Sequence, residues 1–283
     1  MASRKSELLL FGHPLPDRIG QASVEGVDVS SILTKASGFM GAYDYTLNPY
    51  SGCSFGCTYC YAAFFAREPE LRDSWGKWVQ VKQNAVDRIR RMRSEIRGKT
   101  IYMSSVTDPY QPIEKQARIV RDILEELVIH QPRLVIQTRS DLVKRDIDIL
   151  KHFEVVRVNM TVTTDSEEVR KVFEPYCPSL QRRLAGIQAI HEAGIRSCIT
   201  MTPLLPIQDL TAFADALIAT GLRDFVVQPF HTVRGRFVAG TREGARALVE
   251  RMGWDDTKYR YVVDYLRTRL PSLYEGQEGF APA

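Results

Sequence analysis

The sequence predicts an α/β fold in which about six parallel strands form a partial (β/α)6 barrel of the TIM type. Between residues 44 and 230, short apolar segments alternate with helical segments, which is the pattern of βαβ units in a parallel sheet. Six such units are fewer than the eight that close a barrel, so we expect an open sheet. The chain of 283 residues is 44% hydrophobic and 25% charged, which suits a globular protein with one sizeable core.

The strands and helices are expected in strict alternation. Each predicted strand is a short apolar segment, and the six run over 45–48, 100–104, 133–137, 155–162, 196–201 and 224–228. The helices between them are expected over 84–97, 116–130, 141–152, 179–193 and 210–220. Apolar residues from Ala85 to Ile96 recur at helical spacing, and Gly194 and Gly221 are typical of residues that end a helix.

The two ends of the chain carry weaker patterns. Residues 1–43 are interrupted by glycine and proline and predict an irregular N-terminal arm, whereas 231–283 predict a C-terminal extension with helices near 241–252 and 256–269. We find no internal repeat and no linker, so 1–283 is expected to form one domain around a core at 44–230. His231, Arg234 and Arg236 follow the last strand and are expected on the face that meets an anionic substrate.

Composition narrows the class of protein. The net charge is +4, from 38 basic and 34 acidic residues. This mild excess allows an anionic substrate but does not demand nucleic acid, whose binding proteins usually carry a stronger, clustered basic footprint. No apolar run reaches the roughly 18 residues of a membrane span, and no signal segment is evident, so a cytoplasmic protein that does not bind membranes is expected. Three of the five cysteines lie within eight positions, which favours a metal or cluster site over disulfides.

The cysteine loop is the most informative motif. Cys53, Cys57 and Cys60 have the spacing C-x3-C-x2-C and follow the first predicted strand. Iron–sulfur clusters normally take four cysteines, so a [4Fe–4S] cluster held by these three would keep one iron without a protein ligand. Catalytic metal sites keep such an open position. The motif therefore predicts a chemically active cluster.

Other uses of the same cysteines stay open. A zinc site needs four ligands, and the next cysteine along the chain is the distant Cys177. A redox pair of Cys57 and Cys60 would leave Cys53 unused. A non-catalytic iron–sulfur or zinc-binding protein is the corresponding alternative function.

The loop, with Tyr59 before its last cysteine, resembles the signature of the radical S-adenosylmethionine (SAM) superfamily. Within that superfamily the chain is similar to the spore photoproduct lyase-like group. The resemblance is carried by the segments Cys57–Ala62, Ser104–Glu114, Thr138–Ser140 and Thr161–Arg183. It implies an enzyme of lyase-like or transferase-like subclass that cleaves SAM reductively at a [4Fe–4S] cluster. A 5′-deoxyadenosyl radical then abstracts hydrogen from a substrate, and the electron comes from a donor such as flavodoxin or ferredoxin.

The resemblance also implies residues that bind the cofactor. Thr107 and Asp108 match residues that contact the amino or ribose groups of SAM. Arg139 lies where the lyase has a cofactor-contacting lysine, and Thr161 matches a ribose-binding serine. All four follow or end predicted strands, the face at which parallel α/β folds place their sites. Read without the resemblance, Asp108 in Asp-Pro is equally typical of a turn.

Three further residues are expected near the reacting groups. Tyr59 is expected to pack on the cluster or the adenine, and Tyr61 to line the substrate pocket, where the lyase uses a tyrosine in hydrogen-atom relay. Ser105 stands where the lyase has a hydrogen-donating cysteine, and a serine O–H bond is too strong for that role. DNA photoproduct repair is therefore the alternative reaction and not the leading one. The substrate is unidentified, with a nucleic acid or nucleotide among the candidates.

Overall fold

A computed structural model describes residues 9–10, 13–230 and 243–283. Its largest sheet has eight strands in the order β14-β13-β12-β11-β10-β9-β6-β5, and every neighbouring pair from β6 to β14 is parallel. These strands are β5 (Leu33–Lys35), β6 (Tyr45–Leu47), β9 (Thr100–Met103), β10 (Arg133–Thr138), β11 (Val156–Thr161), β12 (Arg196–Met201), β13 (Asp224–Val227) and β14 (Ser272–Glu275). The six predicted strands and the open, partial barrel are confirmed, and β14 adds a seventh parallel strand.

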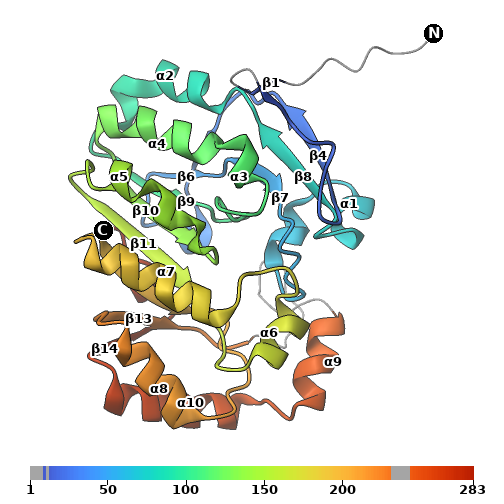
Figure 1. The fold of residues 1–283 in the computed structure, drawn as a ribbon, viewed down its shortest axis with the longest axis vertical. Coiled ribbons are helices and arrows are strands. Elements are labelled where there is room, and N and C mark those ends of the chain that lie inside the picture. The colour runs from blue at the N-terminus through green and yellow to red at the C-terminus, as the bar shows by residue number, and fades with distance from the viewer. Residues whose placement is uncertain (1–8, 11–12, 231–242) are drawn as a thin grey trace.

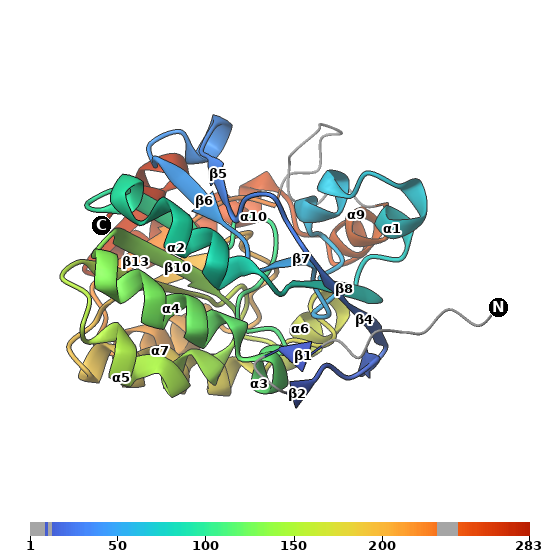
Figure 2. The same ribbon diagram turned by 90° about the horizontal axis from the view of Figure 1, so that it is seen from above.

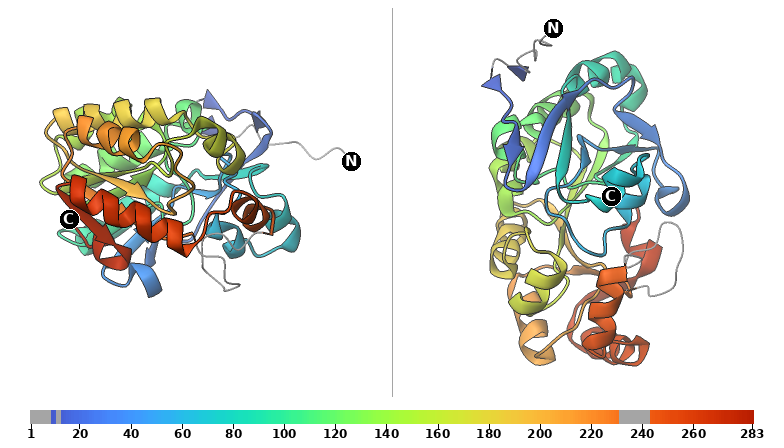
Figure 3. Two further views of the ribbon diagram at one scale, coloured as in Figure 1. Left: turned by 90° about the horizontal axis from the view of Figure 1, so that it is seen from below. Right: turned by 90° about the vertical axis from the view of Figure 1, so that its right-hand side faces the viewer.

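Helices follow the strands around the outer side of the sheet (Figures 1 and 2). They are α2 (Ala85–Ile96), α3 (Glu114–Ala117), α4 (Ile119–His130), α5 (Ile147–Leu150), α7 (Leu180–Glu192), α8 (Leu210–Ala219) and α10 (Asp256–Arg269). The helix α9 (Glu243–Arg251) lies apart from them, on the right-hand side of Figure 1. The C-terminal helices, orange to red, lie at the opposite end of the sheet from α2 and α4 (Figure 3). Two short helices, α1 (Pro69–Asp73) and α6 (Glu167–Phe173), were not predicted. In the described residues no helix has the length and apolar character to cross a membrane.

The N-terminal region is more regular than the sequence predicted. A second sheet, to one side of the barrel (Figure 2), has the order β3-β4-β8-β7. Its strands are β3 (Arg18–Ile19), β4 (Ala22–Val27), β7 (Tyr50–Gly52) and β8 (Trp78–Lys82). Because β4 pairs with a strand more than 50 residues away, no local pattern revealed it. The strand β7 leads directly into Cys53, so this small sheet holds the N-terminal side of the cysteine loop.

The end of the barrel at the amino ends of the strands is filled by residues near the C-terminus. Phe280, in the turn Gly276–Phe280, packs with Tyr102 and other aromatic and apolar side chains inside the barrel. Tyr43 donates a hydrogen bond of 2.8 Å to the Phe280 carbonyl. Gly279 passes so close to Val226 that a Cβ would lie 2.4 Å from a methyl carbon. Side chains for a site are therefore presented at the carboxyl ends of the strands.

Glu114, the first residue of α3, is a fully buried carboxylate. It accepts hydrogen bonds from Tyr50 at 2.5 Å and from the Val120 amide at 3.1 Å, and it pairs with Arg145 at 2.6 Å. Burial raises the pKa of Glu114 to about 7, although Arg145 and Tyr50 act to lower it. Since an unfolded glutamate titrates near 4.5, the folded state holds a proton that the unfolded state has lost between these two values.

This difference predicts how stability depends on pH. The free energy of unfolding should fall as the pH rises from about 4.5 to about 7, and the contribution of Glu114 should be constant above that range. We expect urea-unfolding series across this range to show the fall in wild type and not in Glu114→Gln, so that the difference between the two proteins changes with pH. Equal pH profiles for the two proteins would contradict this titration, whatever the absolute stability of the variant.

Candidate functional site

The cysteine loop lies between β7 and the short 3-10 helix Tyr61–Phe65. Cys53 and Cys57 are buried and Cys60 is partly exposed. Two turns shape the loop, with Gly56 N donating to Cys53 O and Cys60 N to Cys57 O, both at 3.2 Å. Gly56 has φ +58°, and a Cβ there would lie 3.2 Å from the Gly76 Cα, so glycine suits both its conformation and its packing.

The donor set of this loop suits a cluster. Burial raises the pKa of Cys53, and Asp108 and the other two thiols raise it further, so the three sulfurs lie within range of one another's charge. Sulfur donors are the ligands that iron–sulfur clusters take. No three His, Cys, Asp or Glu side chains among the described residues are arranged to hold a single metal ion. Cys53, Cys57 and Cys60 are the residues that would hold a [4Fe–4S] cluster, because their thiols are the donors that such clusters take.

The connection between α6 and α7 packs against the cysteine loop. Thr58 donates to the Phe173 carbonyl through its amide at 2.9 Å and its hydroxyl at 3.3 Å. The same connection brings the Cys177 sulfur to 3.7 Å from the Cys57 sulfur. Contact with Cys177 lowers the pKa of Cys57 against the opposing effect of burial, and Arg139 lowers it further. No local pattern indicates this contact, because 120 residues separate the two cysteines.

Glu174 is a fully buried carboxylate beside this loop. It accepts hydrogen bonds from the Tyr59 hydroxyl and from Thr163 at 3.2 Å. It forms ion pairs with Arg183 at 2.6 Å and with Arg139 at 3.4 Å, and Arg183 is fully buried as well. Burial raises the pKa of Glu174, but Arg183 and Arg139 outweigh this effect and hold the pKa below its ordinary value. Glu174 is therefore an ionised group inside the protein.

Tyr59 and Arg139 are brought together as expected for one site. Arg139 donates to the Tyr59 hydroxyl at 3.1 Å, and its guanidinium carbon lies 5.8 Å from the centre of the Tyr59 ring. The Arg139 side chain keeps 20% of its surface exposed. It is therefore mostly buried, unlike an ordinary surface arginine, but part of it remains accessible. Phe230, after β13, packs edge-to-face against Tyr59 at 6.4 Å.

Thr107 and Asp108 lie after β9, and their side chains are paired within the protein. The buried Asp108 carboxylate accepts from the amides of Tyr110 and Arg139, at 2.9 and 2.7 Å, and from the Thr138 hydroxyl at 2.7 Å. Thr107 donates to the Gly52 carbonyl at 2.7 Å, next to Cys53. These bonds tie the β9 loop to the end of β10 and to the start of the cysteine loop, as in the turn interpretation of Asp108.

Tyr61 and Ser105 also meet at the carboxyl ends of the strands. The Tyr61 hydroxyl donates to the Ser105 backbone carbonyl, and Asn48 donates its amide to the Ser105 hydroxyl at 3.2 Å. Just before, Ser104 has φ 78° and a buried hydroxyl without a hydrogen-bond partner. The backbone is therefore sharply turned immediately before Ser105, the residue that stands where the lyase has its cysteine.

Thr161 belongs to a polar layer inside the barrel. It accepts a hydrogen bond of 2.7 Å from Gln137 and lies 3.1 Å from the Thr200 hydroxyl, while Gln137 also donates to Thr200 at 2.9 Å. Gln137 and Thr200 were not singled out in the sequence. Their alternation with apolar strand residues was the available signal, because polar side chains on buried strands must face a shared interior.

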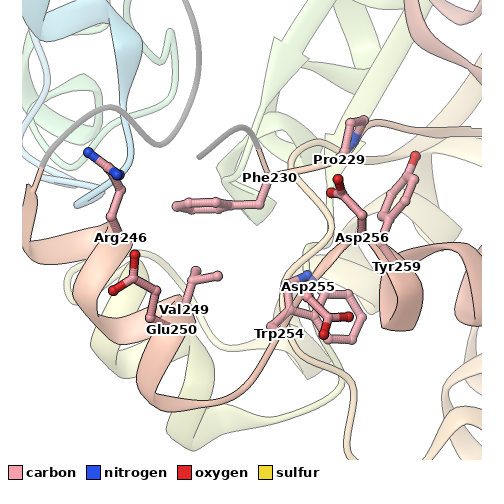
Figure 4. Close-up of a pocket in the computed structure, with 9 residues that line it drawn as sticks. All are labelled: Pro229, Phe230, Arg246, Val249, Glu250, Trp254, Asp255, Asp256 and Tyr259. Carbon is pink, nitrogen blue, oxygen red and sulfur yellow. The ribbon is translucent and has the colours of Figure 1, made fainter. Parts of the chain in front are cut away.

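A cavity of about 310 Å³ lies between the end of β13 and the helices α9 and α10. Phe230, Trp254 and Tyr259 contribute aromatic walls, and Arg246 and Glu250 contribute charges (Figure 4). Because Phe230 also packs on Tyr59, one ring separates this cavity from the cysteine loop. His231, Arg234 and Arg236, which we expected near this face, lie outside the described residues.

The chain matches a known protein family and several known proteins. The model of the Radical SAM superfamily matches residues 47–217. An uncharacterized protein of Methanocaldococcus jannaschii is 39% identical over 162 residues, which is 57% of this chain and 61% of that protein. The radical SAM Nα-GlyT isomerase of Pseudomonas phage M6 is 26% identical over 211 residues, 72% of this chain and 41% of the phage protein. The chain thus spans about three fifths or less of these curated relatives.

Among solved structures, spore photoproduct lyase complexed with a dinucleoside spore photoproduct has the same fold. The TM-score is 0.63 at 15% identity, over 89% of this chain and 81% of the lyase chain.

Proposed function

This chain belongs to the radical SAM superfamily, and on that premise we propose that it cleaves S-adenosylmethionine reductively at a [4Fe–4S] cluster held by Cys53, Cys57 and Cys60. The observation that carries the proposal is the loop itself, which presents three sulfur donors directly after β7 beside the carboxyl ends of the strands. When bound, the cluster and SAM together supply a 5′-deoxyadenosyl radical that abstracts hydrogen from the substrate. An electron donor such as flavodoxin or ferredoxin is part of this proposal.

The chain's own residues have distinct tasks in this proposal. Arg139 offers a partly exposed positive charge beside Tyr59, which suits an anionic group such as the SAM carboxylate. Thr107 and Asp108, already paired, set the backbone of the loop next to Cys53. Thr161, held in the polar layer of the barrel by Gln137, is proposed to bind the ribose of SAM. The surrounding buried side chains exclude water from this chemistry.

On the substrate side, Tyr61 and Ser105 are proposed to line the pocket. All five cysteines lie in described residues, and Cys198 packs with Tyr102 and Val135 in the aromatic and apolar layer deeper in the barrel. Cys177 contacts Cys57 behind the cysteine loop, and neither Cys198 nor Ser105 provides a thiol at the position of the lyase cysteine, so we propose a reaction other than photoproduct repair. Because the similar solved lyase is bound to a dinucleoside photoproduct, nucleotides and nucleic acids are the first substrates to test.

The proposal is tested by product formation. We expect anaerobically reconstituted protein, reduced with dithionite, to convert SAM to 5′-deoxyadenosine and methionine, with the yield rising when a substrate is present. Omission of dithionite or of SAM is the control and should remove both products. If iron-loaded, reduced protein made neither product, the non-catalytic iron–sulfur alternative would replace this proposal.

A further inference from the structure

The Cys57 and Cys177 thiols touch in the interior of the protein. Their sulfurs are 3.7 Å apart, within the range of a hydrogen bond between sulfurs, and their residues are 5% and 6% exposed. They come from different segments, the cysteine loop and the connection between α6 and α7. Cys177 is therefore a fourth thiol at the proposed cluster site that the C-x3-C-x2-C motif does not include.

The position of Cys177 is fixed by the backbone around it. Its amide donates to the Glu174 carbonyl at 3.1 Å, and the buried Arg170 guanidinium donates to the carbonyls of Glu174 and Cys177 at 3.0 and 2.9 Å. The bond from Thr58 to Phe173 holds this connection against the cysteine loop. The backbone of Cys177 is thus held beside the cysteine loop by the fold of both segments, and its buried side chain contacts Cys57.

The chemistry of the two cysteines decides which sulfur carries the proton. A cysteine that ligates iron does so as a thiolate and has no S–H group, so in the pair only Cys177 is left to donate. We propose that Cys177 is a positioning residue that donates an S–H···S hydrogen bond to the iron-ligating sulfur of Cys57 and raises the reduction potential of the cluster. This inference rests on the proposed function, because it requires Cys57 to be a ligand.

The direction of the effect follows from charge. Reduction adds an electron to the cluster and its sulfurs, and a hydrogen-bond donor stabilises the more negative form. Hydrogen bonds to cluster sulfurs are among the features that set these potentials, and residues behind a ligand commonly tune a metal site. A thiol is a weak donor, so the expected change is a shift in potential with the cluster retained.

The test compares Cys177→Ala and Cys177→Ser with wild type, with Cys198→Ala as the matched control. Cys198 is equally buried, and its sulfur lies 3.5 Å from the Ile199 carbonyl, away from the cysteine loop. After anaerobic reconstitution, iron per chain and the midpoint potential are measured by a redox titration monitored by electron paramagnetic resonance. We expect equal iron in all four proteins and a more negative midpoint for Cys177→Ala. The midpoint potential of Cys177→Ser, which keeps an O–H donor, should lie closer to that of wild type. The midpoint potential of Cys198→Ala should equal that of wild type.

Two results would overturn the inference while leaving the proposed function intact. One is a midpoint in both Cys177 variants equal to that of wild type, which would show that no hydrogen bond reaches the cluster. The other is loss of iron from both variants, which would make Cys177 a ligand. Failure of wild type itself to take up iron would instead contradict the proposed function, and this inference with it. If Cys177→Ala does not fold, the serine variant decides between these outcomes.

Discussion

Replacing Cys57 with alanine will abolish cluster assembly and, with it, the formation of 5′-deoxyadenosine. Cys57 is the middle cysteine of the loop in sequence; it is buried, and its sulfur contacts Cys177 in the α6–α7 connection. Its removal leaves two thiols on the loop, too few to hold three irons, and Cys177, whose sulfur is 3.7 Å from that of Cys57, lies on another segment and is expected to stay protonated rather than to take its place. The expected loss is complete and not a graded decrease.

Iron and sulfide content after reconstitution, together with the visible absorption of the cluster, measure this prediction. Cys198→Ala is the control, since it removes a buried cysteine that is distant from the loop in the fold. Normal iron content and product formation in Cys57→Ala would show that this cysteine is not a ligand. Circular dichroism of both apoproteins separates loss of the cluster from loss of the fold.

Arg183→Met should destabilise the protein by about 3–5 kcal/mol, because it leaves the buried Glu174 carboxylate without its 2.6 Å partner. The guanidinium also donates to the carbonyls of Pro178 and Thr161, at 3.0 and 3.2 Å, and these bonds would be lost too. Arg139 is 3.4 Å from Glu174 and compensates only in part. Because Glu174 also accepts from Tyr59, the variant should disturb the cysteine loop as well.

The neighbouring residue provides a matched control. Arg182 pairs with Asp141 at 2.9 Å, but its side chain is 56% exposed, and an exposed ion pair contributes at most about 1 kcal/mol. Urea-unfolding midpoints of Arg182→Met, Arg183→Met and the double variant Arg183→Met with Glu174→Gln measure the difference. The double variant should recover part of the loss, since neutral glutamine needs no cation. Equal stabilities for the two single variants would contradict the buried ion pair.

The barrel was predictable because its signals are local. Apolar strand segments alternate with helical segments along the chain, so the six strands and most helices could be read from periodicity. Cys53, Cys57 and Cys60 could be identified as candidate cluster ligands from their spacing. By contrast, β4 pairs with β8 across a long stretch of sequence, and the strand residues of β4 include serine, glutamate and glycine. Pairing of that kind is decided by tertiary structure and leaves no local pattern.

The site was predictable only in part, for a related reason. Tyr59 was a candidate because it lies inside the cysteine motif, whereas Arg139 and Thr161 were candidates through the resemblance to the lyase, which their positions at strand ends support. Glu174 and Cys177 lie in a connection without periodicity, and a buried carboxylate opposes the usual tendency of charged residues to be exposed. Their importance depends on partners from other elements, which only the fold brings close.

The most direct test of the central claim is whether SAM binds the cluster of this protein. The measurement is the electron paramagnetic resonance spectrum of the reconstituted, dithionite-reduced protein, recorded with and without SAM. If three cysteines leave one iron open, SAM will change the spectrum of the wild-type cluster, because it coordinates that iron. An identical spectrum at saturating SAM would contradict the account, since it would mean that the cluster has no open site for the cofactor.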